Sequence, residues 1–284
     1  MASHRVAPRR HSLLRRAVFR TLELGARALG GRAFYRRFWL ARERLVLREE
    51  VLRIPGLDPR WHGFTLAQLS DLHAGPFLAR GDLAPAVELI GQRGIDLLAI
   101  TGDFLTHRME DSLLVIDDLA RIRAPMGCFA VLGNHDYRGR REPELIAACA
   151  RAGIRVLVDE AVRLERDGAT LWLRGIGDLE EARLLDPMAG AQAIPQDEPD
   201  ILLAHHPRAG RSCVRARTLA VLSGHTHGTQ IDLPLLRRLG PAHPGLRYRS
   251  GSALVVVSRG LGVVGVPLRI GAPAELVFLR LECA

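Results

Sequence analysis

The chain contains no lysine, so all 40 of its basic side chains are arginine. We interpret this bias as the codon composition of a GC-rich genome rather than as a set of selected phosphate contacts. The formal net charge of +9 is also uneven, because residues 1–53 hold fourteen arginines and four glutamates and the other 231 residues sum to −1. A domain that binds nucleic acid needs a basic face on its folded body. The charge distribution argues against such a face, and we expect no nucleic-acid partner.

Cysteine is scarce, and its four copies are scattered without a Cys-x-x-Cys pair. They are Cys128, Cys149, Cys213 and Cys283. A disulfide framework or a thiolate metal site needs clustered cysteines. We therefore expect free thiols in a reducing compartment.

Long apolar runs are absent as well. Arg9-Arg10 followed by Ser12 resembles the start of a twin-arginine export signal, but such a signal continues with about 7–15 apolar residues. Here arginines and a glutamate interrupt every candidate stretch, and none approaches the roughly 18 apolar residues of a transmembrane helix. We expect a cytoplasmic protein with neither a signal peptide nor a membrane span.

The N-terminal segment instead shows an amphipathic pattern. Phe34, Tyr35, Phe38 and Trp39 recur at helical spacing, with arginines around them. Aromatic residues beside arginines suit a helix that lies in an anionic membrane surface, although docking of the stripe on the main domain explains the pattern equally well. We predict a basic membrane-associating arm over residues 1–53, peripheral on the inner face of the cell membrane, and a separate domain over 54–284.

The body of the chain alternates apolar strands with helical patterns and then becomes rich in strands. Helices are expected at 82–93, 111–122 and 142–152, and Asp167-Gly168 predicts a hairpin turn. Residues 234–248 read as a long loop. The expected strands are 64–70, 95–100, 128–132, 156–158, 161–164, 171–173, 201–203, 219–222, 254–257 and 276–279. This order predicts an α/β fold of two packed sheets flanked by helices.

Polar residues directly follow five of the predicted strands. They are Asp71, His73, Asp103, Asn134, His205, His225 and His227. Loops at the carboxyl ends of strands assemble ligand sites in layered α/β folds. Imidazole and carboxylate ligands suit Mn, Fe or Zn. If Asp71 and His73 lie in extended backbone, their side chains share one face, and the same holds for His225 and His227.

These motifs, in order, resemble the calcineurin-like metallophosphoesterase superfamily over roughly residues 64–281. The carrying segments are Asp71-Leu-His73, Gly102-Asp103, Gly133-Asn-His-Asp136, His205-His206 and Gly224-His-Thr-His-Gly228. The resemblance implies a four-layer sandwich of two mixed sheets and two divalent metal ions, with Mn expected and Fe or Zn as alternatives. It implies that Asp71, His73, Asp103 and His227 bind the first ion. It implies that Asp103, Asn134, His205 and His225 bind the second.

The expected reaction is attack on phosphorus by a hydroxide held between the two metals. His135 is assigned to the leaving-group side as a general acid or cationic stabiliser. Asp136 either orients His135 or caps the turn. Asn134, Arg249 and Arg259 are candidate substrate contacts.

The C-terminal stretches from Tyr248 to Gly262 and from Pro267 to Pro273 resemble a bacterial membrane-linked branch of the superfamily. That branch includes enzymes that split UDP-2,3-diacylglucosamine, and the resemblance implies a lipid-linked nucleotide substrate and a role in lipid A biosynthesis. Thr229 departs from the glycine usual in its Gly-His-Thr-His-Gly-Gly motif. A nuclease, a cyclic-nucleotide phosphodiesterase and a non-catalytic scaffold with the same metal fold remain alternatives. Gly133-Asn-His-Asp136 disfavours a protein phosphatase, whose motif ends in glutamate.

Overall fold

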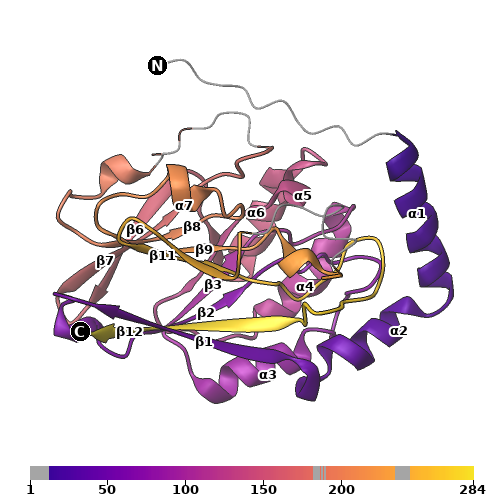
Figure 1. Cartoon of the computed structure of the whole chain (residues 1–284), viewed down its shortest axis with the longest axis horizontal. Helices are drawn as coiled ribbons and strands as arrows, with labels where there is room; N and C mark the ends of the chain where they lie inside the picture. The colour runs from indigo at the N-terminus through magenta and orange to yellow at the C-terminus, as the bar shows by residue number, and fades with distance from the viewer. Residues whose placement is uncertain (1–12, 182–185, 187, 189, 234–243) are drawn as a thin grey trace.

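The computed structural model describes residues 13–181, 186, 188, 190–233 and 244–284. Two six-stranded sheets pack face to face (Figure 1). The first sheet has the order β1-β12-β2-β3-β4-β5. Its strands are β1 (Val46–Ile54), β12 (Glu275–Cys283), β2 (Thr65–Leu69), β3 (Leu97–Thr101), β4 (Cys128–Val131) and β5 (Ile154–Val156). Strands β2 to β5 run parallel, and β12 is antiparallel to β2, so the sheet is mixed.

The second sheet has the order β10-β11-β9-β8-β7-β6 and is also mixed. Strands β11, β9, β8 and β7 are parallel neighbours, with an antiparallel strand at each edge. Its strands are β6 (Glu160–Arg166), β7 (Ala169–Gly175), β8 (Asp200–Leu203), β9 (Thr218–Ser223), β10 (Arg247–Ser250) and β11 (Ala253–Val257). Asp167 and Gly168 both have positive φ in the β6–β7 turn, as the predicted hairpin requires.

Helices flank the sheets, and α1 stands apart at one end of the molecule (Figure 1). The longer ones are α1 (Leu13–Ala28), α3 (Ala84–Arg93), α4 (Met109–Leu119) and α6 (Glu142–Arg151). The shorter ones are α2 (Gly31–Tyr35), the π-helical turn Arg36–Leu40, α5 (Asn134–Tyr137) and α7 (Ala209–Ser212). Short 3₁₀ turns lie at Arg42–Arg44, Pro59–Trp61, Ala191–Ala193 and His227–Thr229. The predicted α/β sandwich is confirmed.

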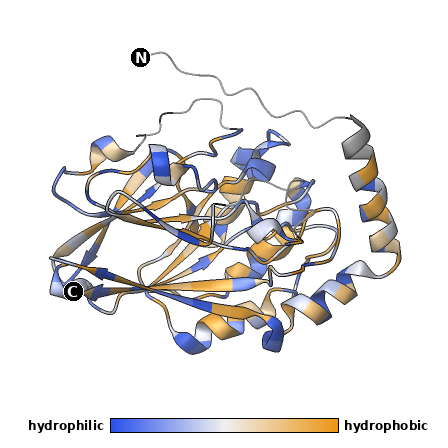
Figure 2. Ribbon diagram, viewed as in Figure 1, coloured by the Kyte–Doolittle hydropathy of each residue, from blue (hydrophilic) through white to orange (hydrophobic). Residues whose placement is uncertain are grey.

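The central strands are apolar on both faces because each face packs against a different part of the core. In β2, Leu66 packs between the two sheets, whereas Leu69 packs under the helices. In β3, Leu97 faces the other sheet and Leu98 faces the helices. A strand buried on both faces reads as a continuous apolar run, and Figure 2 shows hydrophobic residues along the strands of both sheets.

Two strands escape the sequence pattern. Strand β1 pairs with β12 along its whole length, so residues 46–54 belong to the sheet and the predicted boundary at residue 53 cuts through a strand. The pattern fails there because an edge strand tolerates charged residues, and VLREEVLRI carries four of them. Strand β10 occupies the end of the predicted loop 234–248. Residues 234–243 of that loop, and Arg9-Arg10, lie outside the described residues.

The predicted aromatic stripe of the N-terminal segment is divided between two environments. Tyr35 is fully buried, and Trp39 packs against the core. Phe34 and Phe38 are 45% and 44% exposed. Docking therefore explains one half of the stripe and leaves the other half at the surface. In the part of the chain that the structure describes, none of the helices has the length and apolar character of a membrane span.

Candidate metal centre

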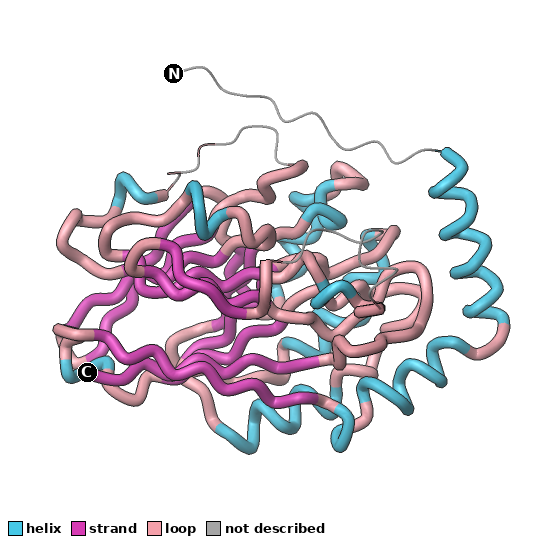
Figure 3. The backbone as a smooth tube through the Cα atoms, viewed as in Figure 1, coloured by secondary structure: helices cyan, strands magenta, loops and turns pink. Residues whose placement is uncertain are grey.

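The seven predicted ligands meet where the parallel strands of both sheets end. Strands β2, β3 and β4 lead into Asp71, Asp103 and Asn134, and strands β8 and β9 of the other sheet lead into His205 and His225. The loops that follow the strands are pink in Figure 3. Six of the seven residues are buried, and His225 alone among them is half-buried. The structure therefore assembles one polar site from segments that are distant in sequence.

A first donor group consists of Asp71, His73 and His227, which offer ligand atoms within 4.8 Å of one another. The Nε2 atoms of His73 and His227 lie 3.0 Å apart. Nε2 of His227 lies 3.4 Å from Oδ1 of Asp71. Both imidazoles thus turn the same nitrogen toward one point beside a carboxylate.

A second donor group consists of Asn134, His205 and His225. Oδ1 of Asn134 lies 3.2 Å from Nε2 of His205 and 3.2 Å from Nδ1 of His225. Asp103 stands between the two groups, because its Oδ2 lies 3.3 Å from Nε2 of His73 and 3.4 Å from Nε2 of His205. A single carboxylate is therefore shared, as a bridging ligand would be.

The electrostatics of the site favour bound cations. Burial raises the pKa of Asp71 to about 6. Burial and the nearby charge of Asp103 raise the pKa of Asp136 to about 8. Buried carboxylates without a cation are costly, so a cation would offset the cost. The donors are nitrogen and oxygen only, which fits Mn, Fe or Zn.

The backbone of the site differs from the extended conformation predicted for the Asp-x-His and His-x-His pairs. Asp71, His73 and Asp103 have φ of 50°, 47° and 56°, and His225 and His227 have φ of 68° and 52°. That prediction is wrong because β2 and β9 end before these residues and the chain turns sharply. Such left-handed residues cost about 1–3 kcal/mol each and persist where the surroundings fix them.

Hydrogen bonds and close packing fix these turns. The amide of Asp71 donates to the carbonyl of Gly102, and the amide of His225 donates to the carboxylate of Asp71. A Cβ atom at Gly133 would lie 2.2 Å from Oδ1 of Asp103. A Cβ atom at Gly224 would lie 2.2 Å from Oδ2 of Asp71. Glycine is needed at both positions because any side chain would clash with the neighbouring carboxylate.

His135 lies beside the first donor group, with its ring edge-on to His73 at 4.7 Å between centroids. Its Nδ1 donates to the carbonyl of Thr106 at 2.9 Å, and Nη1 of Arg138 lies 2.8 Å from its Nε2. Burial, with the charge of Arg138, lowers the pKa of His135 to about 4. Its amide donates to Oδ1 of Asp103, so its position is tied to the shared carboxylate.

Asp136 does not take the role of orienting His135. Its carboxylate accepts the backbone amides of Gly133, Asp103 and Phe104 and so joins the β3 and β4 loops. The turn-capping alternative therefore agrees with the structure. Its short side chain reaches the amides at the helix start and not the ring of the neighbouring residue.

The two arginines predicted to contact the substrate, Arg249 and Arg259, have partners outside the donor groups. Arg249 pairs in register with Leu254, at the start of β11 and away from the carboxyl end of that strand. Arg259 binds the buried carboxylate of Glu275 at 2.6 Å. The predicted substrate contacts at these two positions stay predictions.

Further polar side chains lie next to the donor groups. His206 stacks on His225 at 4.4 Å between ring centroids, and its Nε2 lies 3.6 Å from Glu180. The structure directs the ring of His205 into the second donor group and places the ring of His206 behind His225. Glu180 and Arg138 carry no motif, and only the fold brings them here.

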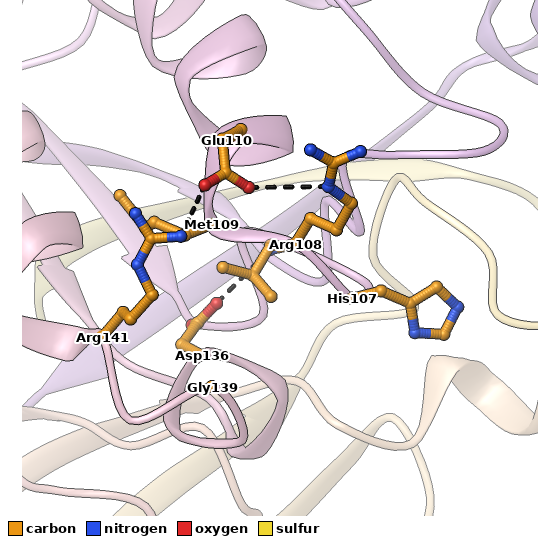
Figure 4. Close-up of a pocket in the computed structure, with 8 residues that line it drawn as sticks. His107, Arg108, Met109, Glu110, Asp136, Gly139 and Arg141 are labelled. Atoms are coloured by element: carbon orange, nitrogen blue, oxygen red, sulfur yellow. Dashed lines mark hydrogen bonds and ion pairs between the residues drawn. The ribbon is translucent and has the colours of Figure 1, made fainter.

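A cavity of about 190 Å³ lies behind Asp136, between the loops that follow β3 and α5. Figure 4 shows Glu110 between the guanidinium groups of Arg108 and Arg141, with His107 pointing away. Arg141 donates to Glu110 at 2.5 Å, and Nε of Arg108 lies 3.5 Å from it. The charges around this cavity are therefore paired with one another.

The profile of the calcineurin-like phosphoesterase family matches residues 64–229, which is more than half of the chain. The chain belongs to this family. A metallophosphoesterase of Helicobacter pylori is 31% identical over 87% of this chain and 67% of its own length. One of Aquifex aeolicus is 29% identical over 89% of this chain and 96% of its own length.

A third relative is the bovine transmembrane protein with metallophosphoesterase domain, 30% identical over 80% of this chain. The chain spans only 55% of that relative's length. The predicted family and the predicted phosphate-ester hydrolase activity are confirmed by these similarities. The family implies divalent metals, and the two donor groups are candidate sites for them.

Proposed function

We propose that this phosphoesterase uses two metal ions to cleave a phosphodiester or pyrophosphate bond. The observation that carries the proposal is the placement of Asp103, whose Oδ2 lies within 3.4 Å of a histidine nitrogen from each donor group. In this proposal Asp71, His73 and His227 hold one ion with Asp103. Asn134, His205 and His225 hold the other ion with the same carboxylate, and manganese is the ion expected at both positions.

When bound, the ions supply Lewis-acid stabilisation of the charge that develops on the phosphoryl oxygens and activate a water molecule. The chain contributes positioning, because five ligands sit in backbone conformations that only the folded loops maintain. His135, in its protonated form, would donate a proton to the departing oxygen. Thr106 and Arg138 hold its ring, and the charge of a bound phosphate favours the protonated form. Asn134 also contacts the substrate phosphate.

The substrate class that we propose is a lipid-linked nucleotide such as UDP-2,3-diacylglucosamine, which would connect the enzyme to lipid A biosynthesis in a bacterium. The resemblance of the C-terminal stretch supports it, together with the exposed rings of Phe34 and Phe38 beside exposed Arg36 and Arg37. A relative named as a transmembrane protein also supports a membrane setting. We propose that the arm ends before residue 46 and binds an anionic membrane surface, where the substrate lies.

The test of the metal centre is the substitution Asp103→Ala in the full chain. We expect it to abolish hydrolysis of bis(p-nitrophenyl) phosphate under excess Mn²⁺ and to reduce the bound manganese measured by plasma mass spectrometry. Asp117→Ala is the control, because Asp117 is exposed on α4 and pairs only at the surface with Arg80. Retention of both activity and metal by Asp103→Ala would overturn the dinuclear proposal.

The substrate class needs a separate test. A panel of UDP-2,3-diacylglucosamine, a cyclic nucleotide and a DNA oligonucleotide should show the highest kcat/KM for the lipid-linked nucleotide. Binding to phosphatidylglycerol vesicles should weaken in the Phe34→Ser, Phe38→Ser double variant, with turnover of the aryl phosphodiester unchanged. Preference for the cyclic nucleotide or DNA would replace the substrate proposal, and unchanged vesicle binding would remove the membrane surface from it.

A further inference from the structure

Arg269 is a buried arginine within the stretch from Pro267 to Pro273, and no role was predicted for it. It is 4% exposed and donates to uncharged acceptors. Its Nε donates to Oη of Tyr35 at 3.0 Å, and its Nη1 donates to the carbonyl of Ala272 at 3.0 Å. Its Nη2 donates to the carbonyls of Arg259 and Gly262. A buried charge is costly unless its hydrogen bonds are satisfied. The guanidinium of Arg269 therefore holds these four acceptors close together.

Tyr35 brings the N-terminal segment into this arrangement. It ends α2, it is fully buried, and its ring stacks on Trp39 at 5.7 Å between centroids. Its hydroxyl donates to the carbonyl of Leu261 at 2.5 Å and accepts from Arg269. The Tyr35–Arg269 clamp, defined by these two side chains, thus grips the loop of residues 259–262 from the side of the N-terminal segment.

The loop 259–262 lies directly on the first donor group. The amide of Gly262 donates to the carbonyl of Asp71 at 2.7 Å, and the amide of Leu261 donates to the carbonyl of Ser70 at 3.0 Å. A Cβ atom at Gly260 would lie 2.6 Å from Cβ of Asp71, so no space separates the loop from this residue. The loop therefore fixes the left-handed backbone that directs the carboxylate of Asp71 into the site.

The clamp reaches a second member of the same group. Nη2 of Arg269 lies 3.4 Å from Nδ1 of His227, on the ring edge opposite the Nε2 that faces His73. The second donor group has different supports. Nδ1 of His205 donates to the carbonyl of Thr101 at 2.8 Å, on the other side of Asp103.

We propose that Tyr35 and Arg269 are positioning residues for one of the two metal ions, the one held by Asp71, His73, Asp103 and His227. The clamp presses the loop 259–262 onto Asp71 and sets the ring of His227. The N-terminal segment is then part of the support of the metal centre as well as a membrane-facing element. This inference rests on the ligand sets of the proposed function.

The test is Mn²⁺ binding to the metal-free full chain, measured by calorimetry and by electron paramagnetic resonance of free Mn²⁺. Tyr35→Phe keeps the buried ring and removes both bonds of the hydroxyl. We expect it to weaken one Mn²⁺ site by about 10-fold and leave the other unchanged, since loss of a supporting group costs 10- to 100-fold in metal affinity. Arg269→Met should weaken the same site by about 100-fold, and Arg269→Lys should recover part of the loss.

Two backgrounds identify the affected ion. In a His205→Ala background, which removes the second donor group's central ligand, Tyr35→Phe should still weaken the remaining ion. In a His73→Ala background it should have no effect on the ion that remains. Tyr248→Phe is the matched control, because the hydroxyl of Tyr248 donates to the carbonyl of Pro207 at 2.7 Å on the other sheet. It should leave the first ion's affinity unchanged.

The outcomes separate the possible failures. Equal weakening of both ions, or a lowered melting temperature with unchanged Mn²⁺ affinity, would reduce the clamp to ordinary packing and overturn the inference. A wild-type chain that does not bind two Mn²⁺ ions would instead overturn the ligand sets of the proposed function. Tyr35→Phe carries the test even if Arg269→Met does not fold, because phenylalanine preserves the buried ring.

Discussion

The first donor group lies in the interior of the molecule, whereas the second borders solvent at the half-buried His225. Behind the first group stands the loop 259–262, which is held by a buried arginine and a buried tyrosine. Behind His225 stand His206 and the partly exposed Glu180. The two donor groups therefore differ in their support, and we expect the first to be the more rigid and the second to be the side from which substrate enters.

The shared carboxylate makes these two unlike groups a single centre. Asp103 receives the amide of His135 on Oδ1 and faces a histidine of each group with Oδ2. Its own amide is held by Asp136, which also binds the amide of Gly133. The β3 and β4 loops are therefore joined at Asp103 and Asp136, and the amide of His225, which donates to the carboxylate of Asp71, forms a second link between the two groups.

The largest expected effect comes from removing one ligand of either group. His73→Ala and His205→Ala should each lose one Mn²⁺ per chain and lower kcat for an aryl phosphodiester by more than about 100-fold, since even supporting residues cost 10- to 100-fold. Plasma mass spectrometry and steady-state kinetics measure the two quantities. Loss of both ions in one variant and of one ion in the other would show that the groups are unequal and bind in order.

A smaller effect is expected from crowding the first group. Gly224→Ala would place a Cβ atom 1.9 Å from Oγ of Ser70 and 2.2 Å from the carboxylate of Asp71. Overpacking of this kind costs about 1–3 kcal/mol of unfolding free energy, which urea unfolding measures, and it should weaken one Mn²⁺ site. Gly91→Ala is the control, because a Cβ there meets nothing within 4 Å and lies in α3, where alanine is preferred.

An unchanged free energy of unfolding in Gly224→Ala would mean that the loop yields easily around Asp71. The first group would then be no more rigid than the second, and the contrast between them would disappear. A stability loss with both Mn²⁺ affinities intact would show that the crowding is relieved away from the carboxylate.

The sequence predicted that these polar side chains would lie close together, because they follow apolar strands and parallel strands bring their carboxyl ends together. It could not predict the left-handed backbone of Asp71 or His227. At Asp71 that conformation depends on hydrogen bonds with loops distant in sequence, such as the bond from the amide of Gly262 to the carbonyl of Asp71. A periodic pattern describes a strand, and it says nothing about the turn that follows.

The residues that hold the site in place could not be predicted from the sequence for the same reason. Arg269 is one of 40 arginines, and nothing in its neighbours along the chain marks it as buried. Tyr35 was part of an aromatic stripe with two equally good explanations, and only the fold assigns its ring to the interior. Strand β1 was missed because its charged residues suit an edge position. Local composition identifies chemistry at strand ends, while tertiary contacts decide which distant residues hold it in place.

The smallest expected effect concerns the solvent-facing support of the second group. His206→Ala removes the ring that stacks on His225 and its contact with Glu180, and we expect kcat/KM to fall by about 10-fold with two Mn²⁺ ions still bound. His206→Phe retains a stacking ring and should recover most of the loss. A fall as large as that of His205→Ala would show that the second group depends on its neighbours as strongly as the first depends on Arg269. In that case the second donor group, which borders solvent, would be as rigidly supported as the first donor group in the interior.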